Sequence, residues 1–176
     1  EIADEAVTLI TDDGALPLPA GSTLLVTGVA AQELLDAAVE ELAEHGIEAT
    51  AQLLEEVDES AAAAAADAAA GMDAALVLTS SIEFATPPEQ VDLVAQVAAS
   101  GTPVVSASLR NPYDVVHLGP VAASIAAYGN AECDVRAVAR LIAGEIAPYG
   151  TLPVAIPGAD GSGEAYPIGH RAELSG

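Results

Sequence analysis

Short, continuous apolar runs alternate along this chain with segments whose apolar residues recur at helical spacing. Runs typical of buried strands cover residues 24–27, 74–79, 104–109 and 122–127, and a looser alternation over 47–54 is typical of an edge strand. Strands that are apolar on both faces and alternate with helices form parallel sheets covered on both sides. The pattern therefore predicts an α/β fold, a three-layer sandwich around a mostly parallel sheet.

Four helices are expected between these strands. They cover residues 34–42 with Gly46 as the stop, the Ala-rich segment 59–70, the segment from Pro87 to Gly101, and residues 132–145. Right-handed crossovers leave few topologies, and we expect the flavodoxin-like strand order 2-1-3-4-5. A late strand, Leu152–Ile156, is expected at an edge of the sheet because it lies between prolines.

The chain is strongly acidic. Its 176 residues include 27 Asp and Glu against 4 basic residues, all of them Arg, which gives a formal net charge of −23. Such a charge repels nucleic acid and anionic membranes, so neither is expected as a partner. The absence of Lys and the dispersal of the carboxylates favour adaptation to molar salt, where the Debye length is about 3 Å, over an ordinary acidic protein. We expect a soluble protein of a high-salt environment, in a halophile cytoplasm or secreted.

The sequence shows no pattern for a metal or a cofactor, and we expect neither. Cys133 is interpreted as a small buried helix residue, and His45, His117 and His170 have no metal-ligand spacing. The first two histidines are expected at the surface, and His170 is expected to pack against the domain. The turn 28–30 lacks the glycines of a nucleotide-binding loop, so we interpret it as a tight strand-to-helix connection.

The last third of the chain carries the most specific motifs. They are Val-Val-Ser-Ala-Ser-Leu-Arg-Asn-Pro-Tyr-Asp (104–114), Ala-Ala-Tyr-Gly (126–129), Gly-Glu-Ile-Ala-Pro-Tyr-Gly-Thr-Leu-Pro-Val (144–154) and Tyr-Pro-Ile-Gly-His (166–170). This ordered set resembles the C-terminal α/β domain of family 3 glycoside hydrolases, most closely the β-N-acetylhexosaminidase branch. The opening residues 2–18 resemble the start of that domain after a catalytic barrel.

The resemblance implies a domain organisation. Residues 1–176 would form one C-terminal domain, with residues 1–20 as a lead-in helix and linker from an N-terminal barrel. In the family the barrel carries the nucleophilic Asp, so the resemblance gives that role to no residue of this chain. The sequence departs from many members at Arg171, where they continue the terminal motif with Gly.

Four loops lie beyond the carboxyl ends of the expected strands, where open α/β sheets bind ligands. The candidate substrate- or barrel-facing residues on this rim are Ser80, Ser81, Glu83, Arg110, Asn111, Tyr113, Asp114, Tyr128 and Asn130. In some glucosidases of the family a carboxylate from this region is the general acid, whereas the hexosaminidase branch takes its acid/base from an Asp–His pair on a barrel loop. We therefore assign a catalytic role to no residue of this chain, and interpret Glu83, the one candidate acid, as a solvated loop carboxylate.

Arg110 and Asp114 allow two interpretations. Their spacing of four residues permits a charge-assisted pair that would lock the loop, either alone or docked on the barrel. Alternatively, the loop forms a wall of the sugar site, with Arg110 or Asp114 reaching sugar hydroxyls.

The resemblance thus implies the C-terminal domain of a retaining glycosidase of the β-N-acetylglucosaminidase or β-glucosidase type. Its partners would be the barrel of the same protein, whose active site it completes, and a carbohydrate substrate; the chain alone is expected to be inactive. The alternative is a stand-alone, non-catalytic module of the same fold that binds carbohydrate or protein. A receiver or flavin domain is disfavoured, because residues 28–29 and 80–81 are not acidic and the chain has no Lys.

Overall fold

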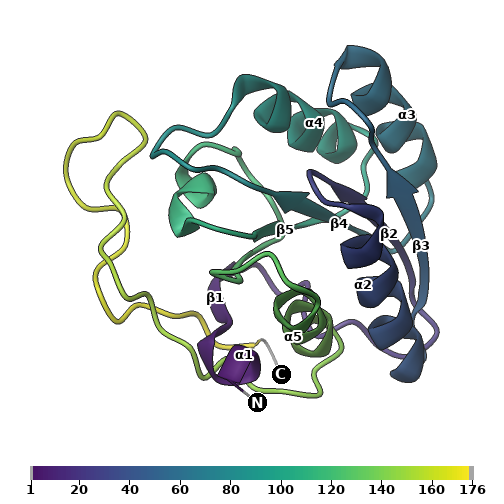
Figure 1. Cartoon of the computed structure of the whole chain (residues 1–176), viewed down its shortest axis with the longest axis horizontal. Coiled ribbons are helices and arrows are strands. Elements are labelled where there is room, and N and C mark those ends of the chain that lie inside the picture. Colours follow the sequence, from purple (N-terminus) through teal and green to yellow (C-terminus); the bar gives the residue numbers. More distant parts are fainter. Residues whose placement is uncertain (1, 175–176) are drawn as a thin grey trace.

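The computed structural model describes residues 2–174 and contains a six-stranded sheet in the order β1-β6-β5-β4-β2-β3 (Figure 1). The strands are β1 (Thr8–Asp12), β2 (Thr23–Gly28), β3 (Glu48–Leu53), β4 (Ala74–Thr79), β5 (Val104–Ser108) and β6 (Ala123–Ala126). Strands β2 to β6 pair in parallel, and β1 pairs antiparallel with β6. The expected α/β sandwich is confirmed, and its five parallel strands have the expected 2-1-3-4-5 order.

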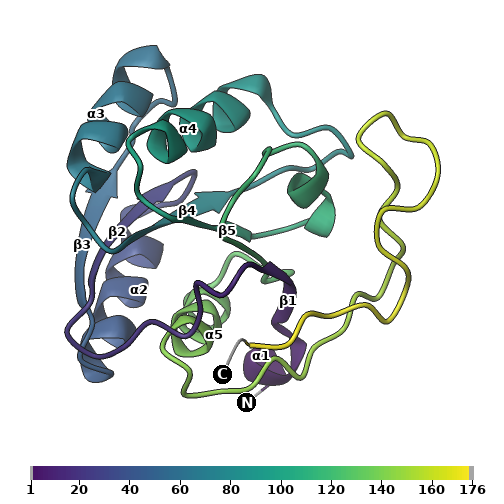
Figure 2. The ribbon, with the colours of Figure 1, turned by 180° about the vertical axis from the view of Figure 1, so that it is seen from behind.

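Helices cover both faces of this sheet. They are α1 (Ile2–Ala6), α2 (Gln32–Glu44), α3 (Glu59–Ala69), α4 (Pro88–Ala99), the short 3-10 helix η1 (Pro112–Val116) and α5 (Glu132–Ile142). Helices α2 and α5 pack on one face and α3 and α4 on the other, as the two opposite views show (Figures 1 and 2). Within residues 2–174, no helix is long and apolar enough to cross a bilayer.

The sheet edge next to β6 differs from the prediction. It is occupied by β1, which lies in the segment 1–20 that was expected to be a helix and linker, whereas Leu152–Ile156 is not a strand. Leu9 and Ile10 are fully buried, so pairing β1 with β6 removes apolar side chains from water while closing the backbone hydrogen bonds of that edge. Pro153 has no N–H to donate to a ladder, and its segment takes part in an isolated bridge instead.

The C-terminal tail crosses the outer side of β1 as an extended segment. Leu152 and Ile156 are buried against Ile10 and Ala126, and a ring nitrogen of His170 lies 2.8 Å from the carbonyl oxygen of Ile10. The expectation that His170 packs against the domain is therefore confirmed. Between these anchors the loop 157–165 projects from the body of the domain (Figure 1).

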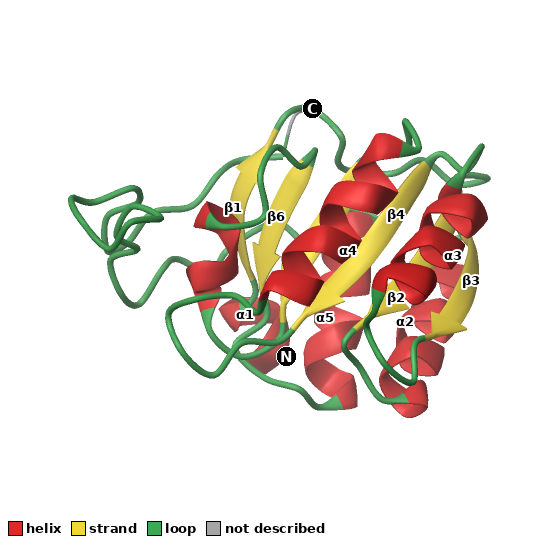
Figure 3. Ribbon diagram, turned by 90° about the horizontal axis from the view of Figure 1, so that it is seen from above, coloured by secondary structure: helices red, strands yellow, loops and turns green. Residues whose placement is uncertain are grey.

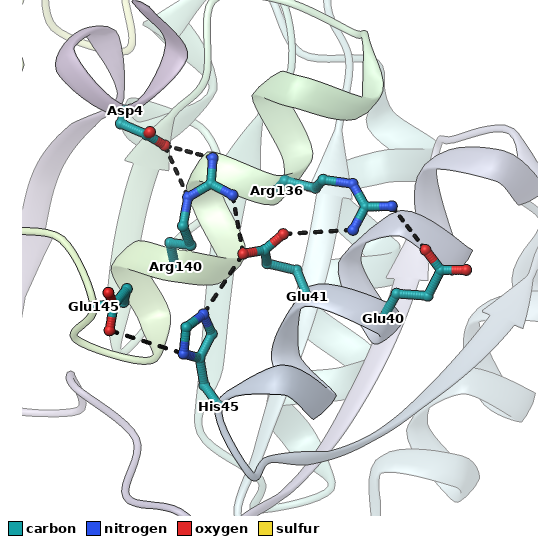
Figure 4. Close-up of polar contacts among 7 residues, drawn as sticks. All are labelled: Asp4, Glu40, Glu41, His45, Arg136, Arg140 and Glu145. Atoms are coloured by element: carbon teal, nitrogen blue, oxygen red, sulfur yellow. Dashed lines mark hydrogen bonds and ion pairs between the residues drawn. The ribbon is translucent and has the colours of Figure 1, made fainter. Parts of the chain in front are cut away.

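Helices α1, α2 and α5 are joined by a cluster of charged side chains (Figure 4). Arg140 donates two hydrogen bonds of 2.9 and 2.6 Å to Asp4 and forms an ion pair of 2.9 Å with Glu41. Arg136 contacts the same Glu41 at 3.4 Å and Glu40 at 2.7 Å. Burial raises the pKa of Glu41, but the hydrogen bonds and charges of the two arginines outweigh it and hold that pKa below its usual range.

Two interpretations of single residues are wrong. Cys133 is exposed, because it lies in the first turn of α5 ahead of that helix's buried face. His45 is partly buried at the end of α2, with its ring nitrogens 3.5 Å from Glu41 and 3.9 Å from Glu145. The histidine thus extends the charged cluster beyond the two arginines.

We expect Glu41→Gln to lower the free energy of unfolding by about 2 kcal/mol at pH 7, because both arginines lose a charged, nearly buried acceptor. A carboxylate with a depressed pKa stabilises the fold above its unfolded pKa of about 4.3, and this contribution is lost as the pH falls through the lower folded pKa. The deficit relative to the wild type should therefore shrink between pH 7 and pH 3 in urea unfolding. Glu44→Gln, on the exposed end of the same helix, is the control; an equal deficit at both pH values would contradict the ionic role.

Candidate functional site at the carboxyl edge of the sheet

The parallel strands end at one edge of the sheet, to which the arrowheads of β2, β3 and β4 point in Figure 3. Gly28 closes β2 there with φ of 123°, and a Cβ on it would lie 2.1 Å from the carbonyl oxygen of Leu78 in β4. The N–H of Val29 donates to that same oxygen over 2.8 Å. Only glycine fits so close an approach, which brings the loops after β2 and β4 together.

Asp114 connects two of the loops at this edge. Its carboxylate is fully buried and accepts hydrogen bonds from the hydroxyls of Thr79 (2.6 Å), Ser81 (2.5 Å) and Thr86 (2.7 Å). The loop after β4 is thereby fixed to η1. The predicted Arg110–Asp114 pair does not form, because η1 turns Asp114 inward to these hydroxyls while the Arg110 side chain stays exposed.

The loop after β4 is held at two further points. Gln90, a buried residue of α4, accepts from the N–H of Ser80 (2.9 Å) and donates to its carbonyl (3.0 Å). Thr86 Oγ1 also lies 3.2 Å from Nδ1 of His117, whose ring meets Phe84 edge-on at 5.0 Å. His117 is thus part of the rim, which corrects its assignment to a plain surface position.

The remaining candidates divide into anchored and exposed side chains. Asn111 donates to the carbonyl of Ile82 (2.7 Å), and Tyr113 contacts Phe84 with ring centroids 5.5 Å apart. Glu83 and Asn130 are exposed, as is Arg110. The structure therefore brings the nine candidates to one rim, with Ser81 and Asp114 inside it as structural groups.

Tyr128 has a left-handed backbone, with φ of 63°, which is uncommon for a residue other than glycine. Its hydroxyl donates to Thr8 Oγ1 over 3.0 Å, and burial raises its pKa more than this bond lowers it. The next residue, Gly129, has no room for a side chain, since a Cβ would lie 2.1 Å from the carboxylate of Asp134. Strained backbone held by its surroundings is a frequent property of binding sites.

Two hollows flank the Arg110 side chain. A groove of about 870 Å³ runs across the ends of the strands between the starts of α2, α4 and α5. Five carboxylates line it, from Glu33, Glu55, Glu56, Glu89 and Glu132. A smaller hollow of about 330 Å³ lies on the other side and is lined by Ile82, Arg110, Asn111, Tyr128, Gly129 and Asn130. Among the described residues, no group of three or more His, Cys, Asp or Glu could hold a metal ion.

Several residues of this site were not singled out from the sequence. No sequence motif includes the residues Thr79, Thr86 and Gln90 or the five glutamates of the groove. Hydroxyls and amides at strand and helix ends are common in any α/β protein. The one available signal was the position of Asp114, two residues after Pro112. A carboxylate in such a turn requires nearby hydrogen-bond donors if it points inward.

Solved structures share this fold over most of the chain. A family 3 β-N-acetylglucosaminidase from Paenibacillus sp. matches with 25% identity and a TM-score of 0.72, covering 85% of this chain and 30% of that one. A β-glucosidase from Listeria innocua matches with 17% identity and a TM-score of 0.79 over 99% of this chain and 33% of that one. A fungal multi-domain family 3 β-N-acetylglucosaminidase matches at 22% identity and a TM-score of 0.71, over 94% and 19%.

The chain spans about a third or less of the length of each of these structures. A search of the curated proteins finds no match. The model of the glycosyl hydrolase family 3 C-terminal domain matches residues 6–173. The chain therefore belongs to the family of glycosyl hydrolase family 3 C-terminal domains.

Proposed function

We propose that this chain is the C-terminal domain of a retaining glycoside hydrolase of the β-N-acetylglucosaminidase or β-glucosidase type. In this proposal the rim packs on a barrel domain that carries the nucleophile, and the rim completes the barrel's active site around a carbohydrate substrate. Support comes from the family match over residues 6–173 and from the enzymes in which the same fold is found.

The observation that carries the proposal is the rigid construction of the rim. Asp114 and Gln90 fix the loop after β4 from opposite sides, so the exposed groups beyond them are held in place. Ile82 is 79% exposed although it is apolar, and it stands beside Arg110 on this fixed surface. A surface whose side chains are already fixed can dock on another domain with little further loss of conformational entropy.

A retaining glycosidase uses two carboxyl groups, and among the rim candidates Glu83 is the one proposed as an acid. That mechanism needs an acid and a nucleophile about 5–5.5 Å apart on either side of the bond, and Glu83 is an exposed loop residue with no assigned carboxyl partner across a substrate. The proposal therefore leaves Glu83 in its role as a solvated carboxylate and gives the chemistry to the barrel.

We expect the isolated chain to hydrolyse neither aryl β-N-acetylglucosaminides nor aryl β-glucosides. The assay is run in molar KCl and in dilute buffer, with Glu83→Gln and Asp92→Asn as matched variants; Asp92 is exposed on α4, outside both hollows. Turnover that survives repurification and is lost with Glu83→Gln alone would make Glu83 the catalytic acid and overturn this division of roles.

The alternative, a non-catalytic carbohydrate-binding module, is supported by the groove of about 870 Å³, a size in the range of small-ligand sites. Calorimetric titration of the isolated chain with N-acetylglucosamine oligosaccharides tests it. Binding with a Kd below about 1 mM, abolished by Asn130→Asp in the groove wall, would favour the module. The proposed domain role predicts no measurable heat.

A further inference from the structure

Arg110 differs from the other three arginines of the chain. Arg136 and Arg140 are held by carboxylates of α1 and α2, and Arg171 contacts Glu173 at 3.3 Å. The guanidinium of Arg110 has no hydrogen bond or ion pair with any residue in 2–174. In a chain with 27 acidic residues, a cation without a carboxylate partner is unexpected.

The hollow beside Arg110 differs in its chemistry from the rest of the surface. None of the six residues that line it is acidic, whereas five glutamates line the adjacent groove. It has a surplus of donors: the guanidinium, the side-chain amide of Asn130, and the backbone N–H groups of Gly129 and Asn130, which donate no hydrogen bond within the described part of the chain. The left-handed Tyr128 sets the path of the backbone leading into Gly129 and Asn130.

A planar fork of N–H groups beside amide donors is the arrangement that binds a carboxylate. We infer that this hollow receives a carboxylate side chain of the barrel, and that this contact fixes how the two domains dock. A free anionic sugar is the weaker source, because it binds only at its bulk concentration, whereas a docked domain delivers its carboxylate at high local concentration. The inference rests on the proposed function, since it names the partner group at the same rim.

The test compares the isolated chain with the full-length protein that contains its barrel. An arginine-specific dione modifies both proteins, and peptide mass spectrometry gives the rate of modification at Arg110. N-acetylarginine added to each sample calibrates the reactivity of the reagent. Amide hydrogen exchange of residues 79–87 and 109–118 is measured on the same samples. Exchange of β4 and β5 in the isolated chain checks that it is folded. A third sample contains the isolated chain with 20 mM glucuronate, about 20 mM being the range in which weak carboxylate binding becomes visible.

We expect Arg110 to react freely in the isolated chain and at least about tenfold more slowly in the full-length protein, since a docked guanidinium reacts only when the contact opens. The rim amides should be protected in parallel. Rim protection with an unchanged Arg110 rate would overturn this inference and leave the domain contact standing. If the full-length protein shows neither slower modification of Arg110 nor protection of the rim amides, the proposed domain contact itself is wrong. Protection of Arg110 by glucuronate, with no protection in the full-length protein, would assign the hollow to a free acidic sugar and also overturn the inference.

Arg110→Lys separates the fork from simple charge. Lys keeps the positive charge but offers no planar pair of donors. In the full-length protein we expect this variant to raise the exchange rate of residues 79–87 nearly as much as Arg110→Gln does. Full retention of rim protection in the Lys variant would contradict the bidentate contact.

Discussion

Replacing Asp114 with Ala is expected to lower the free energy of unfolding of this domain by about 3–5 kcal/mol. Each hydrogen bond to a charged group contributes about 1.5–3 kcal/mol, and the substitution would leave the hydroxyls of Thr79, Ser81 and Thr86 without their buried acceptor. Loss of this size is a large part of the stability of a single domain.

Denaturant unfolding of the isolated chain measures this effect, with Asp92→Ala on exposed α4 as the matched control. Asp114→Asn keeps the shape of the side chain but replaces one acceptor oxygen by a donor, so an intermediate loss is expected. A change below about 1 kcal/mol in the Ala variant would show that Asp114 is not the connection that fixes the rim.

The second large effect concerns salt. The chain has a net charge of −23 and no Lys, and two of its four arginines lie in one cluster of ion pairs. Most of the carboxylates therefore have no neighbouring cation. Their mutual repulsion opposes the compact state in dilute buffer and is screened when the Debye length falls to about 3 Å at 1 M salt. We expect the Tm to rise by roughly 10 °C or more between 0.05 and 2 M KCl, as the stability gain of a few kcal/mol implies.

Differential scanning calorimetry over a KCl series measures this rise. Sucrose at matched water activity is the control, because it stabilises folded proteins without screening charge. A Tm that is the same across the KCl series, or that rises equally in sucrose, would remove the expectation of adaptation to high salt.

The order of the parallel strands was predictable because four of the five are continuous apolar runs, and four of the five are followed by an amphipathic or Ala-rich helix. The position of the outer strand β1 was not predictable from the sequence. Residues 8–12 carry apolar and polar residues in a short stretch, and their β-structure depends on the free edge of β6, a tertiary feature that local sequence does not report. Leu152–Ile156 has the apolar composition of a strand, but Pro153 removes a donor and the segment packs by its side chains instead.

The topology rule correctly predicted that the rim loops share one edge of the sheet, but local spacing did not predict the contacts that their residues make. The spacing of Arg110 and Asp114 suggested a pair, since both charges lie in one loop. Which of them turns inward depends on the hydroxyls of the neighbouring loop, and these come from residues about 30 positions away in sequence. Partners at such separation are fixed by the fold and are invisible to local spacing.

The central claim is that this rim completes the active site of a barrel. Its most direct test is kcat/KM of the full-length protein on an aryl β-N-acetylglucosaminide, for the wild type, for Arg110→Ala on the rim and for Glu44→Ala, an exposed residue at the opposite edge of the sheet. We expect Arg110→Ala to lower kcat/KM by at least about tenfold, equivalent to about 1.4 kcal/mol, and Glu44→Ala to leave it unchanged. Wild-type activity in the Arg110→Ala protein, with its fold intact by calorimetry, would contradict the claim.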